Sequence, residues 1–196
     1  MATSGTTAFD LSIEEIIQEA YERCGMTTTS GHSLRSARTS LNLLFAEWAN
    51  RGIHLWKVAL HENALVSGQA EYAVDSAVSD VLEAFVSTTA AGANTVNTQD
   101  VSLTKIDRSA YAALPNKLAL GQPSQYYVDR QEIPKIYLYQ APNLNTYTVL
   151  KYYVIKRIQD AGAYTNDADI VFRFLPCMVA GLAYYLAMKN APTLVQ

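Results

Sequence analysis

The sequence predicts an α+β fold in which an antiparallel β-sheet region is inserted between helical segments. Near the ends of the chain the patterns are helical: apolar residues recur every three or four positions from Leu34 to Trp48, and an apolar run covers residues 170–188. Between them the apolar period drops to two, first around residues 56–61 and again after residue 125. We expect an antiparallel α-hairpin and a kinked C-terminal helix to form a helical bundle, with the sheet inserted between them.

Length and composition favour one ordered domain spanning residues 1–196. Within it, we assign residues 11–54 and 165–190 to the helical bundle and residues 55–160 to the β-rich insertion. Hydrophobic residues make up 49% and charged residues only 17%, and there are 13 tyrosines, a composition that favours protein interfaces. The net charge of −3 argues against a general nucleic-acid binder.

The first helix has a complete start signal after a flexible arm over residues 1–10. Ser12 can cap the helix, Glu15 can reach back to it, and Leu11 can pack on Ile16. Gly25 ends the helix, and a short polar connector then predicts an antiparallel partner.

The second helix runs through residues 33–51 and stops at Gly52, which can adopt a left-handed conformation. The chain then becomes extended from Leu55. Arg35 and Arg38 lie near the N-terminus of this helix, where its dipole disfavours cations. Glu19 or Glu22 of the first helix, or an acidic group of another subunit, would offset them, so we count both arginines as candidate interface residues.

The middle of the chain alternates strand and turn signals. A flexible loop is expected over residues 87–100, and Asp107 caps a short helix that ends by Ala113. The predicted strands are Glu71–Val74, Val81–Val86, 101–106, Gln125–Arg130, Lys135–Tyr139 and Tyr147–Ile158.

Charge is segregated along this region. Residues 62–100 carry six acids and no Lys or Arg, whereas residues 101–157 carry eight Lys or Arg against three acids. Solvated surface charge is one interpretation. The other is that opposite faces of identical subunits meet head to tail, with candidate contact residues Glu71, Asp75, Asp80, Arg130 and Lys135.

The last helix is predicted from about Asp169 to Lys189. Pro176 lies too deep for a first turn, which predicts a kink or a restart of the helix there. Arg173 and Pro176 favour a helix covered by neighbours over a membrane span. Ala180 and Gly181 would allow another helix to approach closely.

Motifs for catalysis or cofactor binding are missing from the sequence. His32, His54 and His61 lie in no zinc-binding spacing, and there is no phosphate-binding glycine loop, nucleophile elbow or dinucleotide fingerprint. We therefore expect no catalytic, metal or cofactor-binding residues, and reduced, buried thiols at Cys24 and Cys177. A small cell-wall glycan hydrolase stays open as an alternative, since it needs only two well-placed carboxylates, of which Glu14, Glu15, Glu47 and Glu62 are available.

The segment SLRSARTSLNLLFAEWANRGIHLWKV resembles the Trp–(Ala/Tyr)–x–x–Gly helix-to-strand passage of head-to-tail adaptors of short-tailed bacteriophages, which are related to tail tubular protein A. Further segments are similar in the same order: DVLEAFV, DRSAYAALPNK, GQPSQYYVDRQEIPKIYLYQAPN and FLPCMVAGLAYYLAMK.

The resemblance implies a non-enzymatic virion neck protein, made in the host cytoplasm, without cofactor or membrane. It implies a homo-oligomeric ring, a dodecamer, that lies below the portal protein, extends the DNA channel and docks the next tail or nozzle protein. Genomic DNA is expected to pass without sequence-specific binding, because phosphate contacts would hinder sliding, and the acidic residues 62–100 suit a lumen-facing or interface position. The alternative in the same particle is a tail-tube or tail-completion ring protein.

Members of this family bind the portal through their C-terminal segment. Here that segment is NAPTLVQ, residues 190–196, in which Ala191, Pro192 and Leu194 are the candidate contacts. Because it is short, we expect the helices to share the portal contact.

Overall fold

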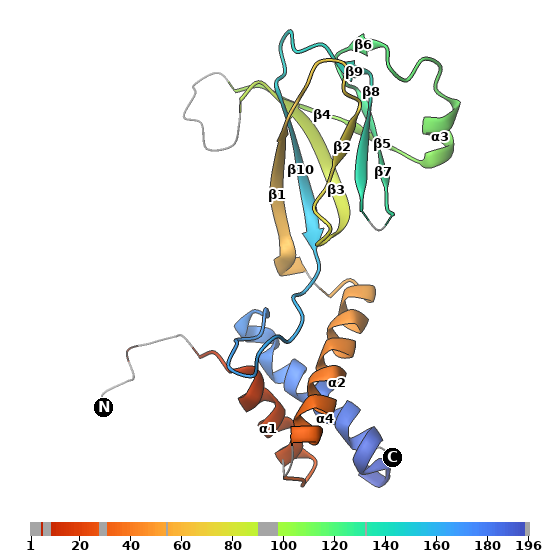
Figure 1. The fold of residues 1–196 in the computed structure, drawn as a ribbon. Helices are drawn as coiled ribbons and strands as arrows, with labels where there is room; N and C mark the ends of the chain where they lie inside the picture. The colour runs from red at the N-terminus through yellow and green to blue at the C-terminus, as the bar shows by residue number, and fades with distance from the viewer. Residues whose placement is uncertain are drawn as a thin grey trace. The chain divides into compact units, whose positions relative to one another are not determined.

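The computed structural model describes residues 5, 9–27, 31–53, 55–89, 98–131 and 133–194, and the chain divides into two compact units. Unit 1 is Met1–Trp56 with Ile158–Gln196 and carries the long helices; unit 2 is Lys57–Arg157 and carries the strands (Figure 1). The predicted mixed α+β class, with antiparallel sheets and a C-terminal helix, is confirmed.

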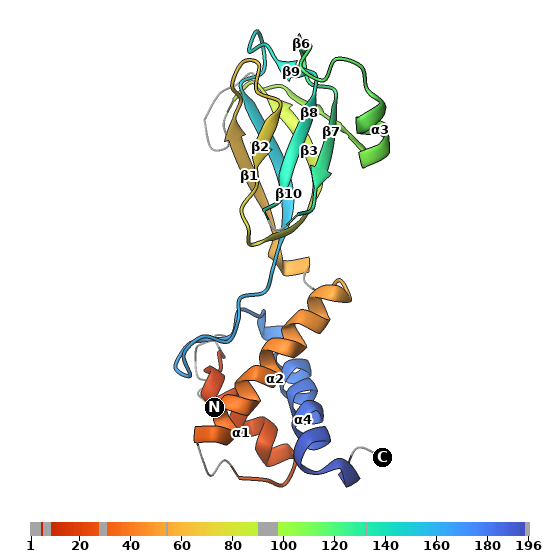
Figure 2. The same cartoon turned by 45° about the vertical axis from the view of Figure 1, so that its right-hand side comes forward.

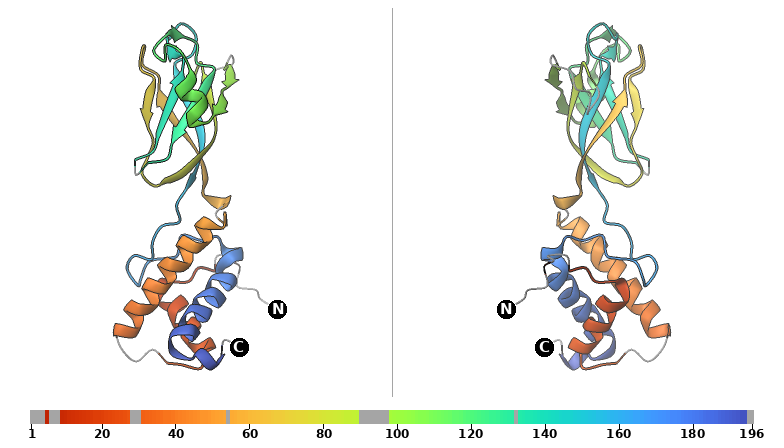
Figure 3. Two further views of the ribbon diagram at one scale, coloured as in Figure 1. Left: turned by 90° about the vertical axis from the view of Figure 1, so that its right-hand side faces the viewer. Right: turned by 90° about the vertical axis from the view of Figure 1, so that its left-hand side faces the viewer.

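Unit 1 is built from three α-helices that share one hydrophobic core: α1 (Ile13–Arg23), α2 (Gly31–Asn50) and α4 (Leu175–Asn190). Figure 3 shows them from two opposite sides, and α4 contacts both α1 and α2. Two 3₁₀ turns flank α4, η2 (Phe172–Phe174) and η3 (Pro192–Leu194). The core contains side chains from all three helices, among them Ile16, Leu41, Met178, Leu182 and Leu186, each fully buried.

Local signals fix where these helices begin and end. Ser12 caps α1: its hydroxyl accepts a hydrogen bond from the backbone N–H of Glu15, while the Glu15 carboxylate accepts one from the N–H of Ser12 at 2.8 Å, as the sequence predicts. Gly52 follows α2 with a φ of +76°, a left-handed conformation that favours glycine.

The start of the last helix differs from the prediction. We expected a helix from Asp169, with Pro176 too deep for its first turn, but α4 begins at Leu175 and Pro176 lies in its first turn. Proline is tolerated there because backbone N–H groups in the first turn of a helix have no intrahelical carbonyl partner, so the N–H that proline lacks is not missed. The chain before it forms the separate turn η2, so of the predicted kink or restart at Pro176 the structure shows the restart. No helix among the described residues is long and apolar enough to cross a membrane.

Unit 2 is a sandwich of two four-stranded sheets (Figure 2). The first has the order β1-β10-β3-β4, formed by β1 (Val58–Ala64), β10 (Val149–Lys156), β3 (Val78–Ser87) and β4 (Asp100–Ser102). The second has the order β2-β8-β7-β5, formed by β2 (Glu71–Ala73), β8 (Lys135–Tyr139), β7 (Gln125–Asp129) and β5 (Thr104–Ile106). A two-stranded pair joins β6 (Leu120–Gly121) to β9 (Ala141–Pro142).

The core of unit 2 lies between the two sheets. Leu150, Tyr152 and Val154 of β10 are buried against side chains of the other sheet, such as Tyr126 and Leu138. Most strand pairs are antiparallel, as expected, but β5 with β7 and β6 with β9 are parallel. These short parallel pairs depend on long-range placement of the chain and have no local signal in the sequence.

The first strand starts later than predicted, because Leu55–Lys57 form a 3₁₀ turn, η1, before β1 begins at Val58. The predicted alternation holds along β1, but the larger apolar side chains point away from the sandwich core. Val58 and Leu60 are 39% and 41% exposed, while Ala59 packs against the core.

A short helix, α3 (Arg108–Ala113), packs on the second sheet. Asp107 caps it as predicted, accepting a hydrogen bond from the N–H of Ala110 at 2.6 Å. The Tyr111 ring stacks on Tyr127 of β7, with 5.5 Å between ring centroids, and Tyr127 stacks on Tyr137 of β8 at 5.9 Å. This tyrosine ladder anchors the helix to the sheet.

Some predicted features fall outside the described residues. These are most of the N-terminal arm, residues 90–97 of the predicted flexible loop 87–100, and His54.

Candidate interaction surfaces

Helix α4 is apolar around its whole circumference, although only part of it is covered within unit 1. Leu175, Met178, Leu182 and Leu186 are buried. The opposite side, which we call the α4 stripe, consists of Cys177, Ala180, Tyr184 and Met188, all exposed. No charged residue occurs between Arg173 and Lys189. A helix that is apolar on all sides is normally covered on all sides, so the α4 stripe is a candidate interface.

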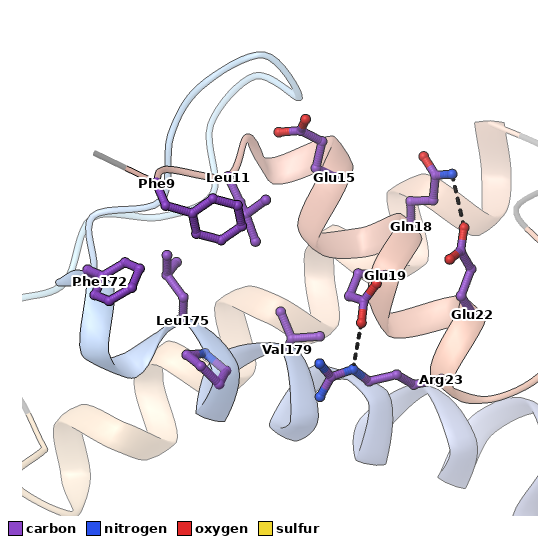
Figure 4. Close-up of a pocket in the computed structure, with 11 residues that line it drawn as sticks. Phe9, Leu11, Glu15, Gln18, Glu19, Glu22, Arg23, Phe172, Leu175 and Val179 are labelled. Atoms are coloured by element: carbon purple, nitrogen blue, oxygen red, sulfur yellow. Dashed lines mark hydrogen bonds and ion pairs between the residues drawn. The ribbon is translucent and has the colours of Figure 1, made fainter. Parts of the chain in front are cut away.

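A groove runs between α1 and the start of α4, with a volume of about 550 Å³; we call it the α1/α4 groove (Figure 4). Leu11, Leu175 and Val179 lie along its apolar part. Phe9 and Phe172 close one end, with their rings edge to face at 6.3 Å, and they are 56% and 61% exposed. Large aromatic rings this exposed are typical of a surface that a partner covers.

The α1 side of the groove is acidic. Glu15, nearest the aromatic end, has its pKa lowered by hydrogen bonds from the backbone and side chain of Ser12. Glu19 pairs with Arg23 at 2.9 Å. Glu22, at the other end, accepts a hydrogen bond from the neutral amide of Gln18 at 3.1 Å and has no cationic partner among the described residues. The α1 side of the groove therefore carries three carboxylates, of which the Glu19–Arg23 ion pair neutralises one, and Glu22 lies at the end away from Phe9 and Phe172.

A second groove, of about 490 Å³, lies between α2 and α4. It is continuous with the α4 stripe, because Tyr184 and Met188 line it together with Trp48 and Leu44 of α2. The Tyr185 hydroxyl donates to Glu47, and this hydrogen bond to a carboxylate raises the pKa of Tyr185.

Unit 2 also exposes an apolar surface, on the side of its first sheet that faces away from the sandwich core. We call it the outer sheet face. Val58 and Leu60 of β1 lie there beside Tyr153 of β10, which is 38% exposed and has its ring 6.1 Å from that of Phe85. Lys151 lies at the centre of this face. Its side chain is only 7% exposed, and its Nζ lies 3.8 Å from a carboxylate oxygen of Asp100.

The charged residues predicted to meet across subunits meet inside unit 2 instead of lying free. Arg130 forms two hydrogen bonds with Asp80, at 2.9 and 3.0 Å, and Lys135 pairs with Glu71 at 2.5 Å. Asp75 accepts a hydrogen bond from the N–H of Ala77. The head-to-tail charge contact stays a prediction, but these pairs neutralise much of the charge on which it was based.

The predicted contacts in unit 1 divide into two kinds. Arg38 has a local role: it donates to the carbonyl of Gly162 at 3.1 Å and lies over the Tyr164 ring at 5.1 Å. Arg35 is exposed and forms no ion pair with any other described residue, so neither Glu19 nor Glu22 of the same chain offsets it.

The C-terminal candidates lie next to α4. The N–H of Ala191 caps the helix on the carbonyl of Ala187 at 2.8 Å, Pro192 is exposed, and Leu194 belongs to η3. They lie next to Lys189 at the C-terminal end of α4. The Nζ of Lys189 donates a hydrogen bond to the Ser40 hydroxyl at 2.6 Å.

Sequence reasoning missed the α1/α4 groove and the exposure of the α4 stripe. A groove between helices depends on how they pack, which local patterns do not encode. The sequence did contain a signal for the stripe. The uncharged run of α4 places apolar residues on every side of the helix, and a single core can bury only some of these sides. The expected burial of both thiols was half wrong, since Cys24 is buried and Cys177 is exposed.

Chemical sites are sparse in the described part of the chain. No group of three or more His, Cys, Asp or Glu side chains there could hold a metal ion. The pKa of His61 is lowered by burial and by the nearby Lys156, which disfavours its cationic form. The prominent features are apolar surfaces, which suit assembly better than catalysis.

Comparison with known proteins agrees with the resemblance seen in the sequence. No curated protein matches the chain. The family described as SU10 adaptor protein matches residues 13–196, which include every helix and strand of the described part of the chain. The chain therefore belongs to the SU10 adaptor protein family and is a bacteriophage head-to-tail adaptor.

Proposed function

We propose that this adaptor is a structural subunit of the neck of a short-tailed phage. Identical copies form a ring, a dodecamer, below the portal protein, where the ring extends the DNA channel and docks the next tail or nozzle protein. The role is assembly, without catalysis. It rests on membership of the SU10 adaptor protein family.

The α4 stripe is the observation that carries this proposal beyond the family. Its exposed, uncharged side chains would aggregate or bind non-specifically on a solitary protein, and they become favourable once a partner covers them. A ring subunit has two neighbours in the ring and further partners along the channel. The chain offers a matching set of surfaces: the α4 stripe, the α1/α4 groove and the outer sheet face.

We assign portal contact to the helical bundle of unit 1. The α4 stripe would provide the apolar area, and Ala191, Pro192 and Leu194 would extend the contact beyond the helix. We assign contact with the next tail component to unit 2, through the outer sheet face.

Passage of DNA requires a channel that does not hold phosphate. The acidic residues 62–100 suit a position at the channel or at a subunit interface. The ion pairs of Asp80 with Arg130 and of Glu71 with Lys135 also neutralise two cations that could otherwise bind phosphate. Each avoided phosphate contact keeps DNA free to slide.

The decisive experiment is cryo-electron microscopy of the full-length protein mixed with its portal. We expect dodecameric ring density on the tail side of the portal. Absence of such density would overturn the proposal, and a ring attached only to another tail component would identify a tail-completion protein. Peptidoglycan turnover that is lost in Glu→Gln variants would instead support the glycan hydrolase.

A variant tests the role of the α4 stripe in the same mixture. Tyr184→Lys places a charge within the stripe at a side chain that is 54% exposed, so it should prevent binding to the portal without lowering the melting temperature. Ser109→Lys, at an exposed position of α3, is the control and should bind normally.

A further inference from the structure

We infer that the α1/α4 groove binds the outer face of α2 from a second copy of this chain, and that this contact joins neighbouring subunits. The inference rests on the proposed ring, for which it names the two surfaces that meet. It follows from four properties of unit 1: the polarity of the groove, the composition of the α2 face, their spacing and their placement.

The groove calls for an occupant with a specific polarity. At one end it presents the exposed rings of Phe9 and Phe172 above Leu175. At the other end it presents Glu22, a carboxylate with no cationic partner among the described residues. A fitting segment has an apolar side chain at one end and a cation at the other.

The outer face of α2 has this composition. Its exposed positions, spaced by three or four residues, are His32, Arg35, Thr39, Leu43, Ala46 and Asn50. Leu43 is the large apolar side chain of this face, 54% exposed. Arg35 is its cation and forms no ion pair with any described residue. The face carries no acid.

The spacings agree. Arg35 and Leu43 are eight residues apart in one helix, about 12 Å along its axis. On α1, Glu22 is seven residues from Glu15, which lies beside the aromatic end, or about 10 Å. With Leu43 between the phenylalanines, Arg35 therefore reaches Glu22, and the neighbour's α2 runs antiparallel to α1.

Both charges are unfavourably placed in their own helices. Arg35 lies near the N-terminus of α2, whose first turn contains no acid, and Glu22 lies in the last turn of α1. Each helix dipole opposes the charge it carries there. Pairing Arg35 of one copy with Glu22 of the next offsets both effects.

The two surfaces face in different directions, as a ring contact requires. Figure 4 looks into the groove, and α2 runs behind α1 and α4 in that view. The exposed side of α2 is opposite its buried residues Ala37, Leu41 and Leu44, so it points away from the core that the groove borders. A groove on one side and its complement on another side give a heterologous contact, which propagates and can close into a ring.

Charge reversal tests the pairing in full-length protein mixed with its portal, with complex mass read by mass photometry. Arg35→Glu and Glu22→Arg should each raise the protein concentration needed for half-maximal ring assembly at least about tenfold. The double variant should restore assembly, because the pair is reversed but complementary. Glu14→Arg, an exposed α1 position outside the groove, is the control and should assemble like the wild type.

Covalent trapping tests the geometry. In a Cys177→Ala background, a chain carrying both Arg35→Cys and Glu22→Cys should form a ladder of disulfide-linked oligomers under oxidation, whereas either cysteine alone should not. Dimers alone, or an intrachain link without oligomers, would overturn the heterologous contact.

The remaining outcomes separate the inference from the proposed ring. If the wild type assembles with the portal and the single reversals assemble equally well, the contact is wrong and the ring stands. If Glu22→Arg weakens portal binding while Arg35→Glu has no effect, the groove binds the portal, and the inference is wrong. If the wild type forms no ring at all, it is the proposed function that fails.

Discussion

Gly181 of α4 lies so close to Leu44 of α2 that a Cβ at position 181 would stand 3.0 Å from one Leu44 methyl carbon and 3.1 Å from the other. Leu44 is buried, with 3% of its surface exposed, and has little room to move. The absence of a side chain at Gly181 therefore sets how closely the two helices pack.

We expect Gly181→Ala to destabilise the protein by about 1 kcal/mol. Alanine improves helix propensity by up to about 1 kcal/mol, but the added methyl group overpacks the helix contact at a cost of about 1–3 kcal/mol. Urea unfolding measures the difference. Ala180→Gly, on the exposed side of the same helix, should lose about 1 kcal/mol from propensity alone. A gain in stability for Gly181→Ala would mean that Leu44 yields freely.

Trp48→Ala should lower the free energy of unfolding by about 3–5 kcal/mol. The indole is only 7% exposed and packs edge to face with Phe174, with 6.3 Å between ring centroids, so its loss leaves a cavity in the core of unit 1. Leu43→Ala, on the exposed side of α2, should change the free energy of unfolding by at most about 0.5 kcal/mol. A Trp48→Ala loss below about 1 kcal/mol would assign Trp48 to a subunit contact instead of the core.

Alkaline pH should destabilise unit 2 through Tyr126. Burial, together with the nearby Asp80 and Glu83 carboxylates, raises the pKa of Tyr126 to about 12. An unfolded tyrosine loses its proton near pH 10. Between pH 10 and 12 the unfolded chain therefore binds fewer protons than the folded one, and stability falls as the pH rises. The contribution is fully present below pH 10 and is lost through pH 12.

The size of this loss is about 2–3 kcal/mol for a shift of two pH units. Urea unfolding of the wild type and of Tyr126→Phe, compared from pH 9 to pH 12, isolates it, because the phenylalanine cannot titrate. The wild type should lose more stability than the variant over this range. Parallel curves would show that Tyr126 titrates normally in the folded protein.

The two cysteines should differ sharply in reactivity. Burial raises the pKa of the Cys24 thiol, which donates to the carbonyl of Ala183 at 3.2 Å, whereas Cys177 is exposed. Since the thiolate is the reactive species, iodoacetamide should modify Cys177 alone in the native protein and both thiols in urea. Peptide mass spectrometry identifies the modified residue. Because Cys177 lies in the α4 stripe, assembly with the portal should slow its modification at least about tenfold, and unchanged reactivity would leave the stripe uncovered.

Features encoded by neighbouring residues could be predicted from the sequence. The cap of Ser12 and Glu15, the cap of Asp107 and the stop at Gly52 involve contacts within a few positions, so the residue types alone specify them. The strand Lys135–Tyr139 was predicted with its observed bounds, because its alternation lies between clear turn signals.

Features that depend on distant parts of the chain could not be predicted from the sequence. Alternation along β1 shows that Val58 and Ala59 face opposite ways, but which side is covered depends on the second sheet. The same holds for Cys177, whose helical pattern gives no sign of which side of α4 the other helices cover. The α1/α4 groove requires Phe9 and Phe172 to meet across most of the sequence.

The chain enters unit 2 at β1 and leaves it from β10, and the strand positions at this boundary, Val58 and Ile155, are direct register partners. A single strand pair thus holds the two connections to unit 1 close together in space. In the proposed assembly, the loops, charges and outer sheet face of unit 2 could therefore change to suit a new tail partner while the helical core keeps its sequence. Docking specificity would then diverge independently of the surfaces proposed to build the ring.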